Sequence, residues 1–153
     1  MVIKETGLIG KQDKLLSFGE TAAISGAATY PCGVTTAASD GVCLDMKVVN
    51  PLKAGEYDPA NLEGFSVNFQ VTTAVTGGTS GTFKVLGSDN MSDWTELAVS
   101  PAIPVAQLTE GAGVVVPVPR GSGSKRYVKA AVTIVGAATA GKVAACVDTF
   151  AGV

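Results

Sequence analysis

The clearest pattern in the chain is an alternation of apolar and polar residues between Phe65 and Val75. Successive side chains of a β-strand point to opposite faces, so this period predicts a strand with one face in a core and one outside. The core set is Phe65, Val67, Phe69, Val71, Thr73 and Val75, and the polar set includes Ser66, Asn68, Gln70 and Thr72. We expect the polar face to meet either water or a neighbouring subunit.

A glycine-rich turn follows this strand, and the alternation resumes from Thr82 to Leu86. A short turn rich in glycine between two alternating segments is typical of a β-hairpin. We therefore predict that these two strands pair with each other.

Similar short segments recur along the chain, separated by turns rich in glycine and proline. They predict strands at residues 20–25, 42–49, 94–99, 114–118, 126–135 and 141–148. Pro117 and Pro119 favour a sheet edge or a strand end for the segment 114–118, because proline cannot donate a backbone hydrogen bond. About eight short strands with no convincing amphipathic helix predict an all-β, antiparallel jelly roll or β-sandwich.

The first 18 residues show little periodicity and indicate an extended N-terminal arm, which leaves residues 19–153 as a single domain. Its candidate contact residues for a neighbouring subunit are Lys11, Lys14, Leu15, Leu16 and Phe18. The alternative is a tail that packs on its own domain. If the arm interpretation holds, deletion of residues 1–12 leaves a folded domain that binds its partner poorly.

Composition narrows the possible partners. The 153 residues carry a formal net charge of −2 with scattered basic residues, so nucleic acid is not expected as a direct partner. The mean hydropathy is positive, yet no apolar run approaches the roughly 20 residues that span a bilayer, so no membrane association is expected. The charged start, Met1 to Gly7, lacks the apolar core of a secretory signal, so we expect no export.

The chain contains no histidine. This excludes Ser-His and Cys-His nucleophile pairs and histidine-ligated metal sites, so we expect neither an enzyme nor a bound cofactor or metal. Carboxylates remain available at Glu56, Asp58 and Glu63, in a long loop between residues 50 and 64. They allow a glycosidase pair, a cation site or an ordinary solvated loop, and the last is the plainest interpretation.

Two other motifs resemble binding sites without completing them. Asp89, Asn90 and Asp93 suggest a calcium loop, but Met91 and Trp94 occupy positions where that loop needs an oxygen ligand and a glycine, so a self-capping turn is expected. The segment 136–142 has the spacing of a phosphate-binding P-loop, but Val143 replaces the hydroxyl residue that binds magnesium. We expect a turn before the final strand there.

The three cysteines, Cys32, Cys43 and Cys146, form no zinc or redox motif. A bridge between Cys32 and Cys43 is conceivable if they close a loop between strands, but free thiols in a reducing cytoplasm are the expected state.

Three stretches in the same order resemble the capsid cement, or decoration, proteins of tailed bacteriophages. They are the segment Asp13 to Ile24, the segment LGSDNMSDWTEL from Leu86 to Leu97, and the closing stretch from RYVKA at Arg126 through GKVAA at Gly141. The resemblance spans most of the chain and rests on order and length more than on any one motif.

The resemblance implies a structural virion protein that is made in the host bacterial cytoplasm and sits on the capsid exterior. It would bind the major capsid protein, bridge neighbouring subunits of the shell and associate with itself as a dimer or trimer.

The rival interpretation is a carbohydrate-binding β-sandwich, either secreted or part of a phage receptor-binding structure. It requires either a calcium-bound loop or exposed, coplanar aromatic rings in a groove. The candidate rings are Phe65, Phe69, Phe83, Trp94 and Tyr127. Most of these fall on strand faces predicted to point inward, so core packing is the expected role.

Overall fold

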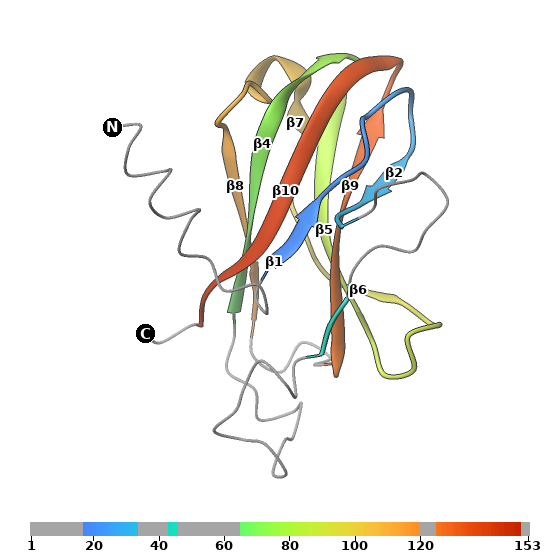
Figure 1. Ribbon diagram of the computed structural model, residues 1–153, viewed down its shortest axis with the longest axis vertical. Helices are drawn as coiled ribbons and strands as arrows, with labels where there is room; N and C mark the ends of the chain where they lie inside the picture. The colour runs from blue at the N-terminus through green and yellow to red at the C-terminus, as the bar shows by residue number, and fades with distance from the viewer. Residues whose placement is uncertain (1–16, 34–42, 46–64, 120–124, 151–153) are drawn as a thin grey trace.

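The computed structural model describes residues 17–33, 43–45, 65–119 and 125–150. This part of the chain forms antiparallel strands in two sheets that face each other (Figure 1). In chain order the elements are β1 (Ser17–Glu20), β2 (Thr29–Pro31), β3 (Leu44–Asp45), β4 (Phe65–Gly77), β5 (Ser80–Ser88), β6 (Thr95–Val99), β7 (Ile103–Pro104), the short 3₁₀ helix η4 (Val105–Gln107), β8 (Gly113–Val118), β9 (Tyr127–Val135) and β10 (Ala138–Phe150).

One sheet has the strand order β1-β10-β4-β8 and the other has the order β2-β9-β5-β6. The short strands β3 and β7 extend the second sheet by pairing with β9 and β5. The chain crosses between the sheets from β1 to β2, from β4 to β5 and from β9 to β10, so pairs of strands wrap together around the core. This is a jelly-roll form of the β-sandwich, and it confirms the fold class expected from the sequence.

The predicted hairpin between the strand at Phe65 and its successor is wrong. Strand β4 pairs with β10 and β8, whereas β5 lies in the other sheet and pairs with β9. Gly77 and Gly78, with φ angles of 71° and 76°, form a corner between sheets. The β9–β10 corner packs against it, and the Thr79 N–H donates to the Val135 carbonyl over 2.7 Å.

The core lies between the sheets and follows the predicted alternation. In β9, Val128, Ala130, Val132 and Ile134 are buried, as expected. In the middle of the core the rings of Phe69 and Phe83 pack with centroids 5.1 Å apart. Each fully buried side chain of this size contributes roughly 1.5–3 kcal/mol to folding.

Thr73 is an exception, because it was expected to face the core and is exposed. It lies opposite Lys142, where the pairing of β4 with β10 shifts register between Lys142 and Val143. A register irregularity changes which face a residue points to, so the strict period fails at this position.

The predicted strand at residues 20–25 is displaced toward the N-terminus. Strand β1 starts at Ser17 and ends at Glu20, so Ser17 and Phe18 belong to the folded domain rather than to an arm. After Glu20 the backbone turns to the second sheet: the Gly33 N–H donates to the Glu20 carbonyl over 2.9 Å, and Thr21 forms a bridge with Cys32.

Strand β8 lies at the edge of its sheet, as its prolines predicted. Pro117 pairs with Ser66 of β4. In the described sheet β8 has no strand on its other side, so the backbone N–H that proline lacks is not needed for pairing there.

Of the strand predicted at residues 42–49, Leu44 and Asp45 form β3, and residues 46–49 lie outside the described part. Within the described ranges no helix has the length and apolar character to cross a bilayer.

Candidate interaction surface

The outer surface of the β1-β10-β4-β8 sheet, which we call the front face, consists mainly of short uncharged side chains. The strand period that buries Phe69 turns Asn68 and Gln70 outward, where both are half-buried. The register places Val115 and Cys146 beside Asn68, and Gly113 and Ala144 beside Gln70. We define the front face by Glu20, Ser66, Asn68, Gln70, Thr72, Val115, Pro117, Lys142 and Ala144.

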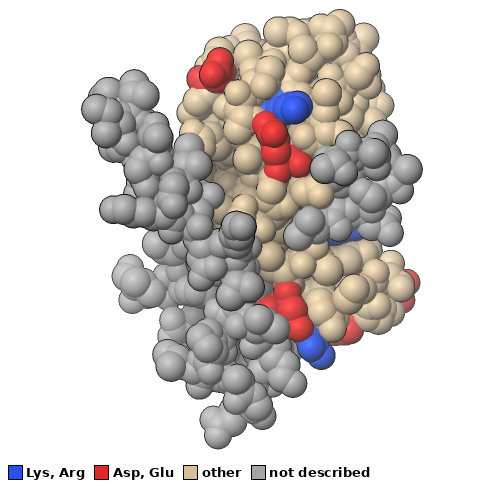
Figure 2. Space-filling view, in the orientation of Figure 1, with Lys and Arg blue, Asp and Glu red and all other residues tan. Residues whose placement is uncertain are grey.

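Two charged side chains lie among these residues, and they neutralise each other. Lys142 Nζ is 3.9 Å from Glu20 Oε2, and each side chain is 42% exposed. The Thr72 hydroxyl donates a hydrogen bond to the same carboxylate. In Figure 2, which views this side of the molecule, one blue group with red beside it interrupts an otherwise tan central area.

The edge strand β8 adds apolar surface to the front face. Val115 is 55% exposed, and Pro117 is exposed two residues further on. A surface that combines exposed aliphatic groups with neutral hydrogen-bonding side chains resembles the core of a protein–protein interface, where charged residues are depleted.

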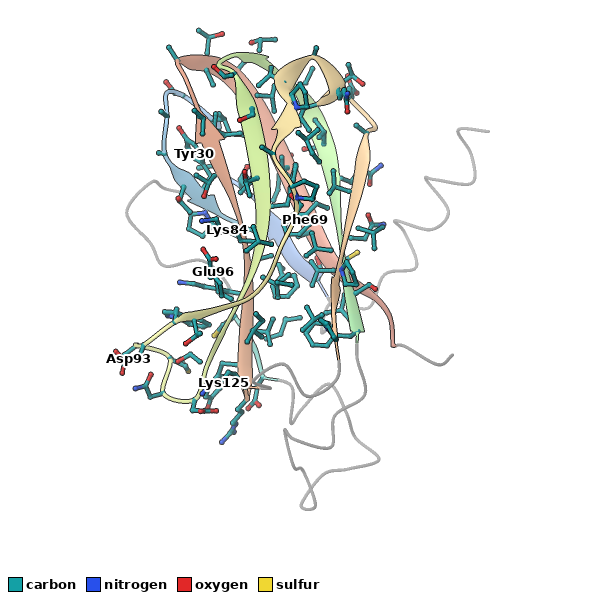
Figure 3. The ribbon with its side chains drawn as sticks, turned by 180° about the vertical axis from the view of Figure 1, so that it is seen from behind. Tyr30, Phe69, Lys84, Asp93, Glu96 and Lys125 are labelled. Atoms are coloured by element: carbon teal, nitrogen blue, oxygen red, sulfur yellow. The ribbon has the colours of Figure 1, made fainter. Side chains whose placement is uncertain are left out.

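The outer surface of the β2-β9-β5-β6 sheet, which we call the back face, has a different character (Figure 3). Near its centre Lys84 Nζ lies 3.0 Å from Glu96 Oε1. On the same sheet, Lys129 Nζ stands 4.2 Å from the centroid of the Trp94 ring. Charged groups of this kind keep favourable hydration in water, so removing this face from solvent is costly.

More charges gather at the start of β9, at the end of the back face that carries Lys125 in Figure 3. Arg126 binds the Asp45 carboxylate through two hydrogen bonds, of 3.0 Å from Nε and 2.8 Å from Nη2. Lys125 Nζ donates to Asp89 Oδ2 over 2.9 Å. This hydrogen bond, followed by one from the Arg126 N–H, lowers the pKa of Asp89 below its ordinary value.

Of the five arm residues proposed as contacts, the structure describes one. Lys11, Lys14, Leu15 and Leu16 lie outside the described residues. Phe18 is 1% exposed and belongs to the core of its own domain. For Phe18 the alternative interpretation, packing on its own domain, is therefore the correct one, because β1 carries its side chain between the sheets.

The candidate chemical sites do not assemble in the described part. Glu56, Asp58 and Glu63 lie outside it, and within it no three potential metal ligands come together. Asn90 Oδ1 accepts hydrogen bonds from the backbone N–H groups of Ser92 and Asp93, at 2.9 and 2.8 Å. This is the self-capping turn that the sequence predicted in place of a calcium loop.

The segment 136–142, which has the spacing of a P-loop, forms a corner and the first part of a strand. Gly136 forms the turn after β9, and strand β10 already begins at Ala138. Lys142 therefore points from the middle of a strand to Glu20, not into a phosphate-binding loop.

The five candidate aromatic residues divide into two groups. Phe65, Phe69 and Phe83 are buried in the core, as expected. Tyr127 and Trp94 are half-buried at the surface, and each ring is covered by a cation, Arg126 at 4.9 Å and Lys129 at 4.2 Å from the ring centroid. These five candidate rings thus present no bare coplanar platform for a sugar.

Sequence reasoning identified the polar side of β4 but not the assembled front face. Val115 and Lys142 join it because β8 and β10 flank β4, which depends on long-range pairing. The signal in the sequence was the absence of charge among Ser66, Asn68, Gln70 and Thr72, since water-facing strand positions often carry Lys or Glu.

Comparison with known protein families matches residues 33–147 to the family described as Bbp16. A search of curated proteins finds no match for the chain. The family match covers both corners of the jelly roll and six of the eight strands in the two sheet orders, from β4 to β10 in full apart from the last residues of β10. The chain belongs to the Bbp16 family.

Proposed function

We propose that this protein is a capsid cement subunit of a tailed bacteriophage, which binds the outer surface of the head and stabilises the shell. The observation that carries the proposal is the front face, where the described charges form one internally paired couple. The resemblance of three ordered stretches to cement proteins supports it independently.

The physics of the two sheets assigns them opposite roles in this proposal. Covering the front face removes Val115 and Pro117 from water and desolvates one described ion pair, Lys142–Glu20. Covering the back face would desolvate the Lys84–Glu96 pair and the cation over Trp94. We therefore place the front face against the major capsid protein and the back face toward solvent.

A cement subunit bridges neighbours, so it needs more than one contact. Self-association into a dimer or trimer provides one route, because a symmetric oligomer presents the same face to several capsid subunits. The arm residues Lys11, Lys14, Leu15 and Leu16 remain candidates for a second route.

The test is reconstitution on heads that lack this protein. Heads purified from a phage with the gene deleted are mixed with the purified protein, and bound copies are counted by gel densitometry after sedimentation. We expect saturable binding and a higher temperature of DNA release. Heads that stay bare, or that bind without gaining heat resistance, would contradict the proposal. A glycan array run in parallel tests the carbohydrate-binding alternative.

A further inference from the structure

The connection between β5 and β6 extends beyond the sandwich as a short finger, which we define as residues 88–94. In Figure 3 the labelled Asp93 lies at the outer end of this connection, away from both sheets. The finger joins two strands of the back-face sheet, and in Figure 1 it extends sideways beyond the lower part of the sandwich.

Met91 holds an unusual backbone conformation in this finger. Its φ angle is 63°, and among the described residues it is the one non-glycine residue with a positive φ. An L-amino acid with a side chain as large as methionine is disfavoured in this region, so its surroundings must impose the conformation.

Side-chain hydrogen bonds provide that constraint. The Ser88 hydroxyl belongs to a fully buried residue and accepts from the Asn90 and Met91 N–H groups, at 3.2 and 2.9 Å. Asn90 caps Ser92 and Asp93 through its Oδ1, and its Nδ2 donates to Asp93 Oδ2 over 2.7 Å.

A second anchor ties the finger to the start of β9. Asp89 accepts hydrogen bonds from Lys125 Nζ at 2.9 Å and from the Arg126 N–H at 3.4 Å. The finger is therefore fixed at its base and along its side, although most of its residues are exposed.

This rigid frame presents one large apolar group to solvent. Met91 is 52% exposed, and Asp89 and Asp93 flank it with carboxylates. Methionine adapts its shape to irregular pockets, and a loop that is ordered before binding loses less entropy on association. A strained, preorganised and exposed apolar residue is a feature of binding loops rather than of a simple turn.

We propose that Met91 inserts into an apolar pocket bordered by basic side chains on a second capsid protein subunit, distinct from the one beneath the front face. This inference rests on the proposed cement function and deepens it, because the finger and the front face give the domain two contacts in different directions. The basic border of the pocket follows from the Asp93 carboxylate, which is bonded to the neutral Asn90 amide, whereas Asp89 is already paired with Lys125.

The test compares Met91→Gly with native protein on heads that lack the cement protein. Glycine adopts positive φ freely, so this variant should melt at the native temperature or slightly above it. Loss of the side chain should weaken binding to heads by about tenfold or more, as expected for an anchor residue. Asparagine also tolerates this conformation, so Met91→Asn is a second variant that removes the methionine side chain without the added backbone freedom of glycine.

A matched control removes an exposed apolar group elsewhere. Val135 is 51% exposed at the end of β9 in the back-face sheet, and Val135→Thr should bind heads like the native protein. A second readout is oxidation of Met91 by hydrogen peroxide, followed by mass spectrometry, which should be several-fold slower on heads than in free protein.

The outcomes separate the two claims. If native protein binds heads while Met91→Gly and Met91→Asn bind equally well and Met91 oxidises at the free rate, the Met91 contact is overturned and the cement function stands. If native protein does not bind heads, both fall. Weakened binding together with protection from oxidation establishes the contact.

Discussion

Burial decides the chemistry of the Cys32 thiol. Its side chain is fully buried beneath β10, with Sγ 4.0 Å from the Val143 carbonyl. Because a buried thiolate loses its hydration, burial raises the pKa of Cys32 to about 12. A thiol in this state is a small apolar core residue and not a reactive group.

The raised pKa predicts how stability responds to alkali. The unfolded thiol ionises near pH 9 and the folded one near pH 12, so folding favours the protonated form. The contribution is complete below pH 9 and is lost as the pH rises toward 12, by at most about 4 kcal/mol. Urea titrations of native protein and Cys32→Ala, repeated across this interval, should show native stability falling more steeply with pH; parallel pH profiles would contradict a buried, ionisable Cys32.

Single residues also show where sequence reasoning is reliable. The period of Phe65 to Val71 correctly predicted which side chains enter the core, because burial on a strand depends on local geometry. Phe18 was misassigned because arm and edge strand look alike in a short segment, and its burial depends on a distant partner, β10.

At the scale of elements, the two corners explain how the jelly roll closes. The β4–β5 corner and the β9–β10 corner pack against each other at glycines, where the surrounding atoms leave no room for a side chain. A Cβ on Gly77 would lie 2.6 Å from the Ala137 carbonyl oxygen, and one on Gly136 would lie 2.8 Å from the Thr79 nitrogen. Both glycines have positive φ angles.

Alanine substitutions should separate backbone conformation from close packing. Gly111 has a φ of 88°, but a Cβ added there would meet nothing within 4 Å, so Gly111→Ala should cost about 1–2 kcal/mol. Gly77→Ala and Gly136→Ala should cost about 1–3 kcal/mol more, because backbone atoms must move as well. Chemical denaturation measures the difference; equal losses at all three sites would show that the corners are not tightly packed.

The same corners explain why the predicted hairpin was wrong. A two-residue hairpin and a corner between sheets both require glycine at positive φ, as at Gly77 and Gly78. Local sequence therefore predicted the strands and the turn but not the partner of either strand. Partner choice depends on β9 and β10, which lie far along the chain from β4 and β5.

At the scale of the whole molecule, the two outer faces differ in charge. The front face has one paired acid and base among its described side chains, whereas the back face and its lower end carry three ion pairs and a cation over Trp94. Under the proposed function, the sheet with fewer charges lies on the capsid protein and the sheet with more charges meets solvent.

The most direct test of these opposite roles introduces a charge on each face at matched positions. Gln70 on β4 and Thr82 on β5 are both half-buried, outward-facing residues of central strands. Melting temperatures of Gln70→Lys, Gln70→Glu and Thr82→Lys establish that each variant is folded, and sedimentation with heads that lack the protein measures binding.

Both Gln70 variants should bind heads at least about tenfold more weakly than native protein, because either sign of charge must be desolvated in the contact. Thr82→Lys should bind like native protein. If the Gln70 variants saturate heads at native concentrations, or if Thr82→Lys alone loses binding, the front face is not the surface that contacts the capsid.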